Sequence, residues 1–340
     1  MNLAKSDIAF FLGSKTLAED FATSMFRLKL SEPFATIVNF SPLKVPLTFN
    51  PPSKSRALIL LLSSIMLFLY LLFLKGTFVD AVNGALKEYS GMASLIGKEE
   101  IDMFANLILL TGILGSAMIT VPYNCLTTLV KDRENKVDYD ILATPLKRGQ
   151  IILSYFVSAA VASVILTGII LVIGLVAVGV QGNSCLDVIR IMKALGIVII
   201  GSVSATAVFM IVILFFKSVS ASGAFFGMLS AASGFVIGAY IPISQFSNAV
   251  QTVCNIFPAS QVTIVLRNVL VDGLLEHMDE SLGGVDQGMF TDSMRELFSF
   301  KARLFNGYFD VPHMMVYICA VMFVCVIAQI FLYSVTYKKA

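Results

Sequence analysis

Long apolar runs separated by short polar segments dominate the chain from residue 57 onward. The runs are continuous and do not alternate, so the pattern predicts helices that cross a membrane and not the strands of a β-barrel. A helix needs about 20 residues to cross a bilayer, and the runs meet or approach that length. The predicted spans are 57–74, 103–130, 150–180, 194–216, 218–241 and 314–336.

The segment between the fifth and sixth spans has two parts. It begins with two short apolar stretches that are interrupted at Pro258, and neither stretch is long enough to cross a bilayer. We therefore expect a re-entrant helical pair that dips into the outer leaflet. Residues 272–310 contain eight acidic residues and three basic ones, which predicts a polar external loop.

The first 56 residues differ from the rest of the chain. Residues 14–30 place apolar side chains at helical intervals among charges, which predicts an amphipathic helix lying in the membrane interface. Residues 31–56 hold five of the ten prolines and are expected to be extended or irregular. The sequence thus predicts a cytoplasmic N-terminal segment, 1–56, and a six-span membrane domain, 57–340.

Composition supports an all-α integral membrane protein. The 340 residues are 57% hydrophobic and only 14% charged, and the mean hydropathy is +0.86. A soluble domain would carry about 25% charged residues. The net charge of +2 is too small to indicate nucleic-acid binding. The five cysteines show no paired spacing that would predict a metal site or a disulfide framework.

Basic residues predict the orientation of the spans. With the N-terminus inside, 15 of the 24 lysines and arginines fall on the cytoplasmic side and nine on the other. This bias favours a protein of the plasma membrane with both termini in the cytoplasm.

One charged stretch, residues 131–149, lies between the second and third spans. Val137, Ile141 and Leu142 recur at roughly helical spacing, and Pro145 is placed to begin a new helix. We expect a short surface helix over 133–143 whose apolar edge can contact a partner. A solvated turn that only fixes topology is the alternative, and the pattern alone favours neither.

Small residues recur along the fifth span. Gly223 and Gly227 are four residues apart, as are Gly234 and Gly238. This spacing lets helix backbones approach closely. Packing within the chain and contact between two copies explain the pattern equally well.

Enzymatic chemistry finds little support in the sequence. There are two histidines, no HExxH motif and no convincing acidic or basic residue within a span. A charge at the centre of a span is costly and is usually kept for function, so its absence argues against a proton- or sodium-coupled transporter. We predict no catalytic, cofactor-binding or metal-binding residues, and we expect the energy for any transport to come from another protein.

The layout of spans resembles the permease subunit of type 2 ATP-binding-cassette (ABC) exporters over residues 57–340. Two pairs of segments carry the local similarity. They are Lys131-Asp132-Arg133-Glu134 with Ala143-Thr144-Pro145-Leu146-Lys147-Arg148, and Gly238-Ala239-Tyr240-Ile241-Pro242-Ile243 with Phe257-Pro258-Ala259-Ser260.

The resemblance implies a coupling helix within 131–148 that docks into a separate ABC ATPase subunit, which would itself bind the ATP. The residues expected to couple the two proteins are Arg133, Glu134, Lys136, Val137, Ile141 and Leu142. A second permease copy, identical or related, would complete the transport path, and the cargo would be a drug, peptide, lipid or glycan. A channel or secondary carrier acting alone, and a membrane scaffold or sensor, are the alternatives.

Overall fold

The computed structural model describes most of the predicted membrane domain. The described residues are 75–76, 78–80, 82, 84, 96–137, 146–179, 187–282, 288–305 and 307–336. All of them belong to one compact unit that begins at Asn50. The predicted first span, 57–74, and the predicted N-terminal segment, 1–56, lie outside the described residues.

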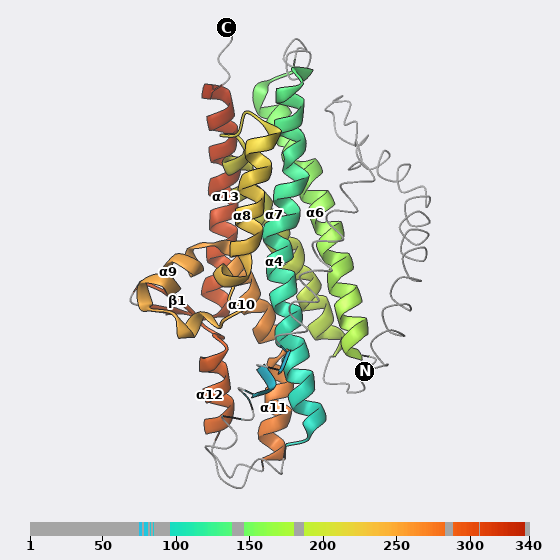
Figure 1. Ribbon diagram of the computed structural model, residues 1–340, viewed down its shortest axis with the longest axis vertical. Helices are drawn as coiled ribbons and strands as arrows, with labels where there is room; N and C mark the ends of the chain where they lie inside the picture. The colour runs from blue at the N-terminus through green and yellow to red at the C-terminus, as the bar shows by residue number, and fades with distance from the viewer. Residues whose placement is uncertain are drawn as a thin grey trace, which may run out of the picture. The chain divides into compact units, whose positions relative to one another are not determined.

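Five described helices are long and apolar enough to cross a membrane. They are α4 (Lys98–Glu134), α6 (Arg148–Gly179), α7 (Val188–Ile213), α8 (Val219–Val236) and α13 (Val311–Thr336), which run alongside one another in Figure 1. A sixth candidate is a helix pair with a sharp bend. The expected all-α membrane fold is therefore confirmed.

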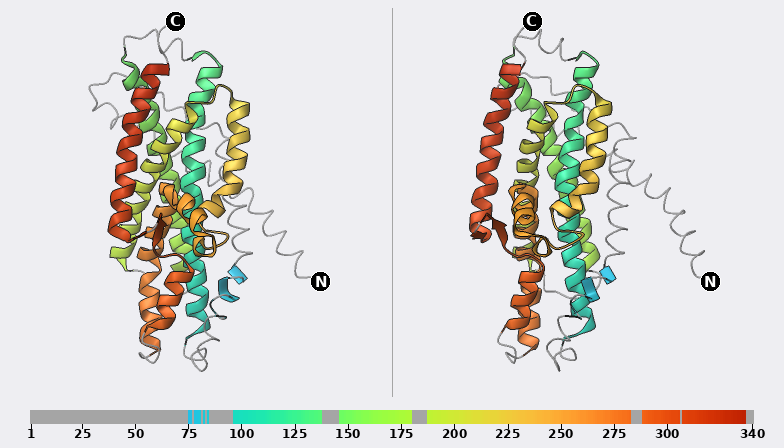
Figure 2. Two further views of the ribbon diagram at one scale, coloured as in Figure 1. Left: turned by 90° about the vertical axis from the view of Figure 1, so that its left-hand side faces the viewer. Right: turned by 60° about the vertical axis from the view of Figure 1, so that its left-hand side comes forward.

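Helix α4 is the centre of the bundle. In its most apolar window 89% of residues are buried, whereas the corresponding share is 11–22% in α6, α8 and α13. Figure 2 shows α8 on one side of α4 and α13 on the other. Apolar and exposed outer surfaces are expected for helices on the outside of a membrane bundle.

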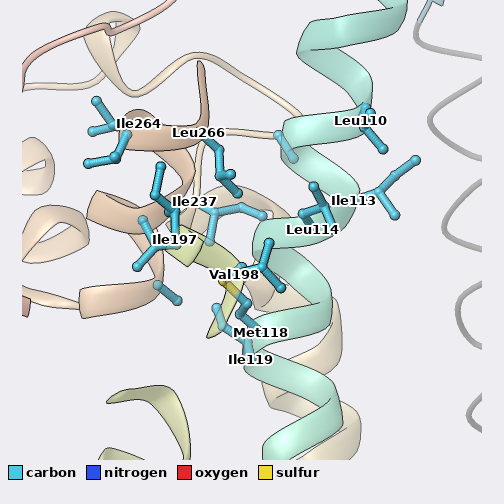
Figure 3. Packing of buried hydrophobic residues seen from close by; sticks show 14 of the residues in the cluster. Leu110, Ile113, Leu114, Met118, Ile119, Ile197, Val198, Ile237, Ile264 and Leu266 are labelled. Atoms are coloured by element: carbon cyan, nitrogen blue, oxygen red, sulfur yellow. The ribbon is translucent and has the colours of Figure 1, made fainter. Parts of the chain in front are cut away.

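The core forms where α4 meets α7 and α10 (Pro258–Leu270). Leu114 and Met118 of α4 lie against Val198 of α7 and Ile237, and Ile264 of α10 lies nearby (Figure 3). Glycines bring the backbones close in this region. A Cβ atom on Gly201 would lie only 2.7 Å from the Val262 side chain and 3.0 Å from the sulfur of Met118.

The predicted re-entrant pair consists of α9 (Asn248–Ile256) and α10, and the two helices meet at an angle of 95°. Pro258 is the first residue of α10, where its missing N–H costs no hydrogen bond. Helix α10 is buried against α4, α7 and α13, so it belongs to the bundle and not only to the lipid leaflet.

The polar segment before α13 is largely helical. It contains η1 (Ile243–Gln245), α11 (Asp272–Ser281) and α12 (Met289–Leu297), followed by two antiparallel strands, β1 (Ala302–Leu304) and β2 (Gly307–Phe309). The sequence did not predict this hairpin, because three-residue strands are too short to show alternation.

Ion pairs tie this polar segment together and to the neighbouring ends of α4 and α7. Arg295 donates two hydrogen bonds to Asp272, at 2.7 and 3.1 Å. Burial disfavours the charged form of Arg295, but its bonds to Asp272 and the charges of Asp272 and Asp292 outweigh burial and raise the pKa of Arg295. Elsewhere the His277 side chain lies 3.4 Å from Glu100 of α4.

Two helix boundaries differ from the predicted spans. Helix α8 ends at Val236, because Gly238 adopts a left-handed backbone (φ +68°) that terminates the helix. Helix α4 has 37 residues and is therefore about 55 Å long, well beyond the roughly 30 Å of a hydrocarbon core. Helix α4 thus connects the polar segment to the opposite end of the bundle.

The close approach at Gly201 provides a test of this packing. We expect Gly201→Val to destabilise the protein by about 1–3 kcal/mol, because the new side chain would overlap Val262 and Met118. Gly196→Val on the same helix is the matched control, since no atom lies within 4 Å of a Cβ there. Thermal unfolding of both variants in detergent measures the effect, and equal midpoints would contradict the packing described.

Candidate functional site

The end of α4 that leads into the predicted coupling segment is bonded to the junction between α7 and α8. The guanidinium of Arg133 donates hydrogen bonds to the backbone carbonyls of Leu214 (3.0 Å) and Phe216 (2.8 Å). These carbonyls lie just beyond the end of α7, where helix carbonyls have no partner within the helix. A cation is favourable there because the helix dipole is negative at its C-terminus.

Glu134, the next residue, binds the beginning of α8. Its carboxylate accepts a hydrogen bond of 2.7 Å from the backbone N–H of Val219, the first residue of that helix. The hydroxyl of Ser218 accepts another from the N–H of Ala221. Both acceptors satisfy amide groups that the first turn leaves free, and the anion also matches the positive end of the helix dipole.

The predicted coupling residues therefore lie in different parts of the structure. Arg133 and Glu134 are in the last turn of α4, and not in a separate helix that begins at 133. Lys136 follows in a left-handed conformation (φ 61°), which ends α4, and the exposed side chains of Lys136 and Val137 come next. Ile141 and Leu142 lie outside the described residues.

Two further bonds connect this end of the bundle. The Tyr155 hydroxyl of α6 donates to the carboxylate of Asp132 on α4 at 2.8 Å. The guanidinium of Arg148, at the start of α6, donates to the backbone carbonyl of Ser334 near the end of α13 at 3.2 Å. These bonds join the end of α4 to α6 and the start of α6 to the end of α13.

The four glycines of the predicted fifth span separate into two pairs. A Cβ on Gly234 would overlap the ring of Tyr240, and Gly238 has a positive φ and lies against Ile243, so this pair packs within the chain. At Gly223 and Gly227 no atom lies within 4 Å of a Cβ, and both residues are exposed.

Arg267 of α10 is a buried charge that the sequence reading did not single out. Its side chain is 1% exposed, and its guanidinium donates 2.7 Å hydrogen bonds to the carbonyls of Gly238 and Phe298. These carbonyls lie at the ends of α8 and α12. Arg267 is the only charged residue between 242 and 271, and that isolation was the signal that could have identified it.

Within the described part of the chain, no group of three His, Cys, Asp or Glu side chains is arranged to hold a metal ion. The charged side chains at both ends of α8 bind backbone groups instead. Such bonds hold the ends of neighbouring helices in fixed positions relative to one another.

The fold and these contacts define a multi-pass membrane protein whose charges connect the ends of its helices. A family model described as ABC-2 family transporter protein matches residues 86–336, which is most of the chain. The chain therefore belongs to the ABC-2 family of transporter proteins. Searches of curated proteins and of solved structures gave no match.

Family membership confirms the resemblance to type 2 ABC permeases. It identifies the chain as a membrane component of a transporter and implies partnership with an ABC ATPase subunit.

Substitution of Arg267 tests its positioning role. We expect Arg267→Met to destabilise the protein by about 2–5 kcal/mol, because buried carbonyls at the ends of α8 and α12 would lose their donors. Arg267→Lys should recover only part of the loss, since an ammonium lacks the planar fork that reaches both carbonyls. The readout is the thermal midpoint, with Lys193→Met, an exposed cation on α7, as the control. A stable Arg267→Met variant would show that these bonds contribute little.

Proposed function

We propose that the chain is the permease subunit of an ATP-driven exporter of the plasma membrane. A separate ABC ATPase subunit binds and hydrolyses ATP, and the permease has no ATPase site of its own. The proposed cargo is a drug, peptide, lipid or glycan. The observation that carries the proposal is the bonding of Arg133 and Glu134 to the α7–α8 junction.

In this proposal the ATPase binds the segment 131–148 on the cytoplasmic side. Movement of that segment reaches α8 through one residue, because Glu134 at the end of α4 bonds the first amide of α8. Arg133 moves the end of α7 at the same time.

The open face of α8 is the proposed contact with a second permease copy. Gly223 and Gly227 leave space that no side chain of the described residues fills. Small residues at four-residue spacing allow two helices to pack closely in lipid. Two copies, identical or related, would then enclose the transport path between them.

The first test separates docking from transmission. We expect Ile141→Ala with Leu142→Ala to weaken binding of the ATPase at least tenfold, since losing buried apolar side chains of this size costs about 2–5 kcal/mol. We expect Glu134→Ala to retain the ATPase but to lose substrate-stimulated ATP hydrolysis, because only its bond to Val219 is removed. Co-purification and ATP hydrolysis in nanodiscs measure the two effects.

Val172→Ala with Ile173→Ala is the matched control, because both side chains are exposed on the lipid-facing part of α6. Labelling of Lys136→Cys by an impermeant maleimide tests the orientation and should require access from the cytoplasm. Wild-type docking and hydrolysis in both the double variant and Glu134→Ala would contradict the coupling role. Transport without any ATPase would support a channel or carrier instead.

The second test concerns the second copy. Gly227→Leu should separate the two α8 helices and shift the complex toward a single permease, as measured by native mass spectrometry from nanodiscs. Gly168→Leu is the control, because no atom of the described residues lies within 4 Å of a Cβ at this half-buried position on α6. An unchanged mass for Gly227→Leu would place the contact between copies elsewhere.

A further inference from the structure

Helix α9 has its apolar side chains turned away from the protein. Val250, Val253 and Ile256 lie on one face at three-residue intervals and are exposed, and Val253 is 65% exposed. A helix that packs on a protein in water buries this face instead. The outward position of these side chains therefore needs an apolar environment.

The polar side chains of α9 are turned inward, where they bind backbone carbonyls. The amide of Gln251 donates to the carbonyl of Phe246 at 2.8 Å, and the amide of Asn255 donates to the carbonyl of Arg303 at 3.0 Å. Asn255 is 1% exposed. Where no water is present, polar groups are expected to turn inward and bond to one another, and apolar groups are expected to face outward.

The β1–β2 hairpin extends the same surface. The hydroxyl of Thr252 on α9 accepts a hydrogen bond of 3.2 Å from the N–H of Phe305 at the hairpin turn. The Phe305 ring is 75% exposed, and Tyr308 is also exposed. The Arg303 guanidinium lies 5.5 Å from the centre of the Tyr308 ring. Arginine and tyrosine with an apolar neighbour are typical of a membrane interface, where rings lie at headgroup level.

This surface is continuous with the lipid-facing side of α13. The Tyr317 hydroxyl donates to the backbone carbonyl of Ile256 at 2.9 Å, so α9 lies beside the first turns of α13. Val316, next to Tyr317, is 70% exposed and begins a row of exposed apolar side chains along the membrane span. The row continues with Phe323, Val324, Ile327 and Phe331.

The direction of α9 agrees with a position along the membrane surface. Helix α10 is packed inside the bundle, and α9 leaves it at 95°. Figure 1 shows α9 and β1 projecting sideways from the bundle, between the spans and the α11–α12 end. A helix in this position cannot cross the membrane with its neighbours.

We propose that α9 and the β1–β2 hairpin form an interfacial anchor that inserts into phospholipid at the boundary between headgroups and acyl chains. Val250, Val253, Ile256 and Phe305 enter the acyl region, and Arg303 with Tyr308 lies at the phosphates. The anchor occupies the leaflet nearer α11 and α12. It holds the end of the re-entrant pair at a fixed depth, and it does not depend on the proposed ATP coupling.

The chain contains no tryptophan, so a single introduced tryptophan reports its own environment. Phe305→Trp and Val253→Trp probe the anchor in the full chain, reconstituted in phosphatidylcholine nanodiscs. Phe323→Trp on the exposed side of α13 is the lipid control, and Glu280→Trp at the exposed end of α11 is the water control.

We expect the emission of both anchor variants to be shifted to the blue of Glu280→Trp. Acyl chains brominated near the headgroup should quench them more strongly than chains brominated near the bilayer centre, and aqueous iodide should quench them weakly. Quenching by iodide equal to that of Glu280→Trp would overturn the proposal, because the surface would then be in water. Protection from both iodide and brominated lipid would also overturn it, since a protein would then cover the surface. Two probe positions keep the test valid if one variant fails to fold.

Discussion

Charged side chains in this protein bind the backbone groups that helices leave unpaired at their ends, and the arrangement of the bundle depends on those bonds. Where such groups are shielded from water, other parts of the protein must satisfy them. Arg133, Arg148 and Arg267 each donate to carbonyls at helix C-terminal ends. Glu134 accepts from an amide at the start of α8. Each charge has the sign that the helix dipole favours.

These bonds make α8 a helix that is held at both ends and open along its side. Glu134 binds its first turn, and Arg267 binds the carbonyl of Gly238 just beyond its last. Arg267 also binds the end of α12, so the polar segment and α8 share one donor. A shift at either end of α8 must therefore be accompanied by a change at α4 or at α10. This coupling supports α8 as the helix that responds to the proposed movement of the coupling segment.

The sequence predicted the five described spans well because each is a continuous apolar run, and lipid permits few other structures. It could not predict the partners of Arg133 and Glu134, which lie 81 to 85 residues away at the α7–α8 junction. The charges of these two residues and their place between two spans predicted a surface contact with a partner. In the structure both side chains also bond to backbone groups of the same chain. Arg267 was missed because it lies on a 13-residue helix, which is too short to be recognised as a span from its sequence. The β hairpin was missed because its three-residue strands are too short to show alternation.

The glycines of the predicted fifth span show why spacing alone could not separate packing within the chain from contact between copies. A small residue lets another backbone approach closely, whether that backbone belongs to the same chain or to a second copy. Only the atoms around the residue distinguish packing within the chain from contact between copies. Gly234 and Gly238 meet Tyr240 and Ile243 of the same chain. The exposed face that includes Gly223 and Gly227 carries mostly small residues, with Met228 and Phe235 as the large exceptions, whereas the exposed face of α13 carries large ones such as Phe323 and Phe331. Large side chains fill the space beside lipid, so a face of small ones leaves room for another helix. The contrast between these two faces supports the proposed second copy against α8.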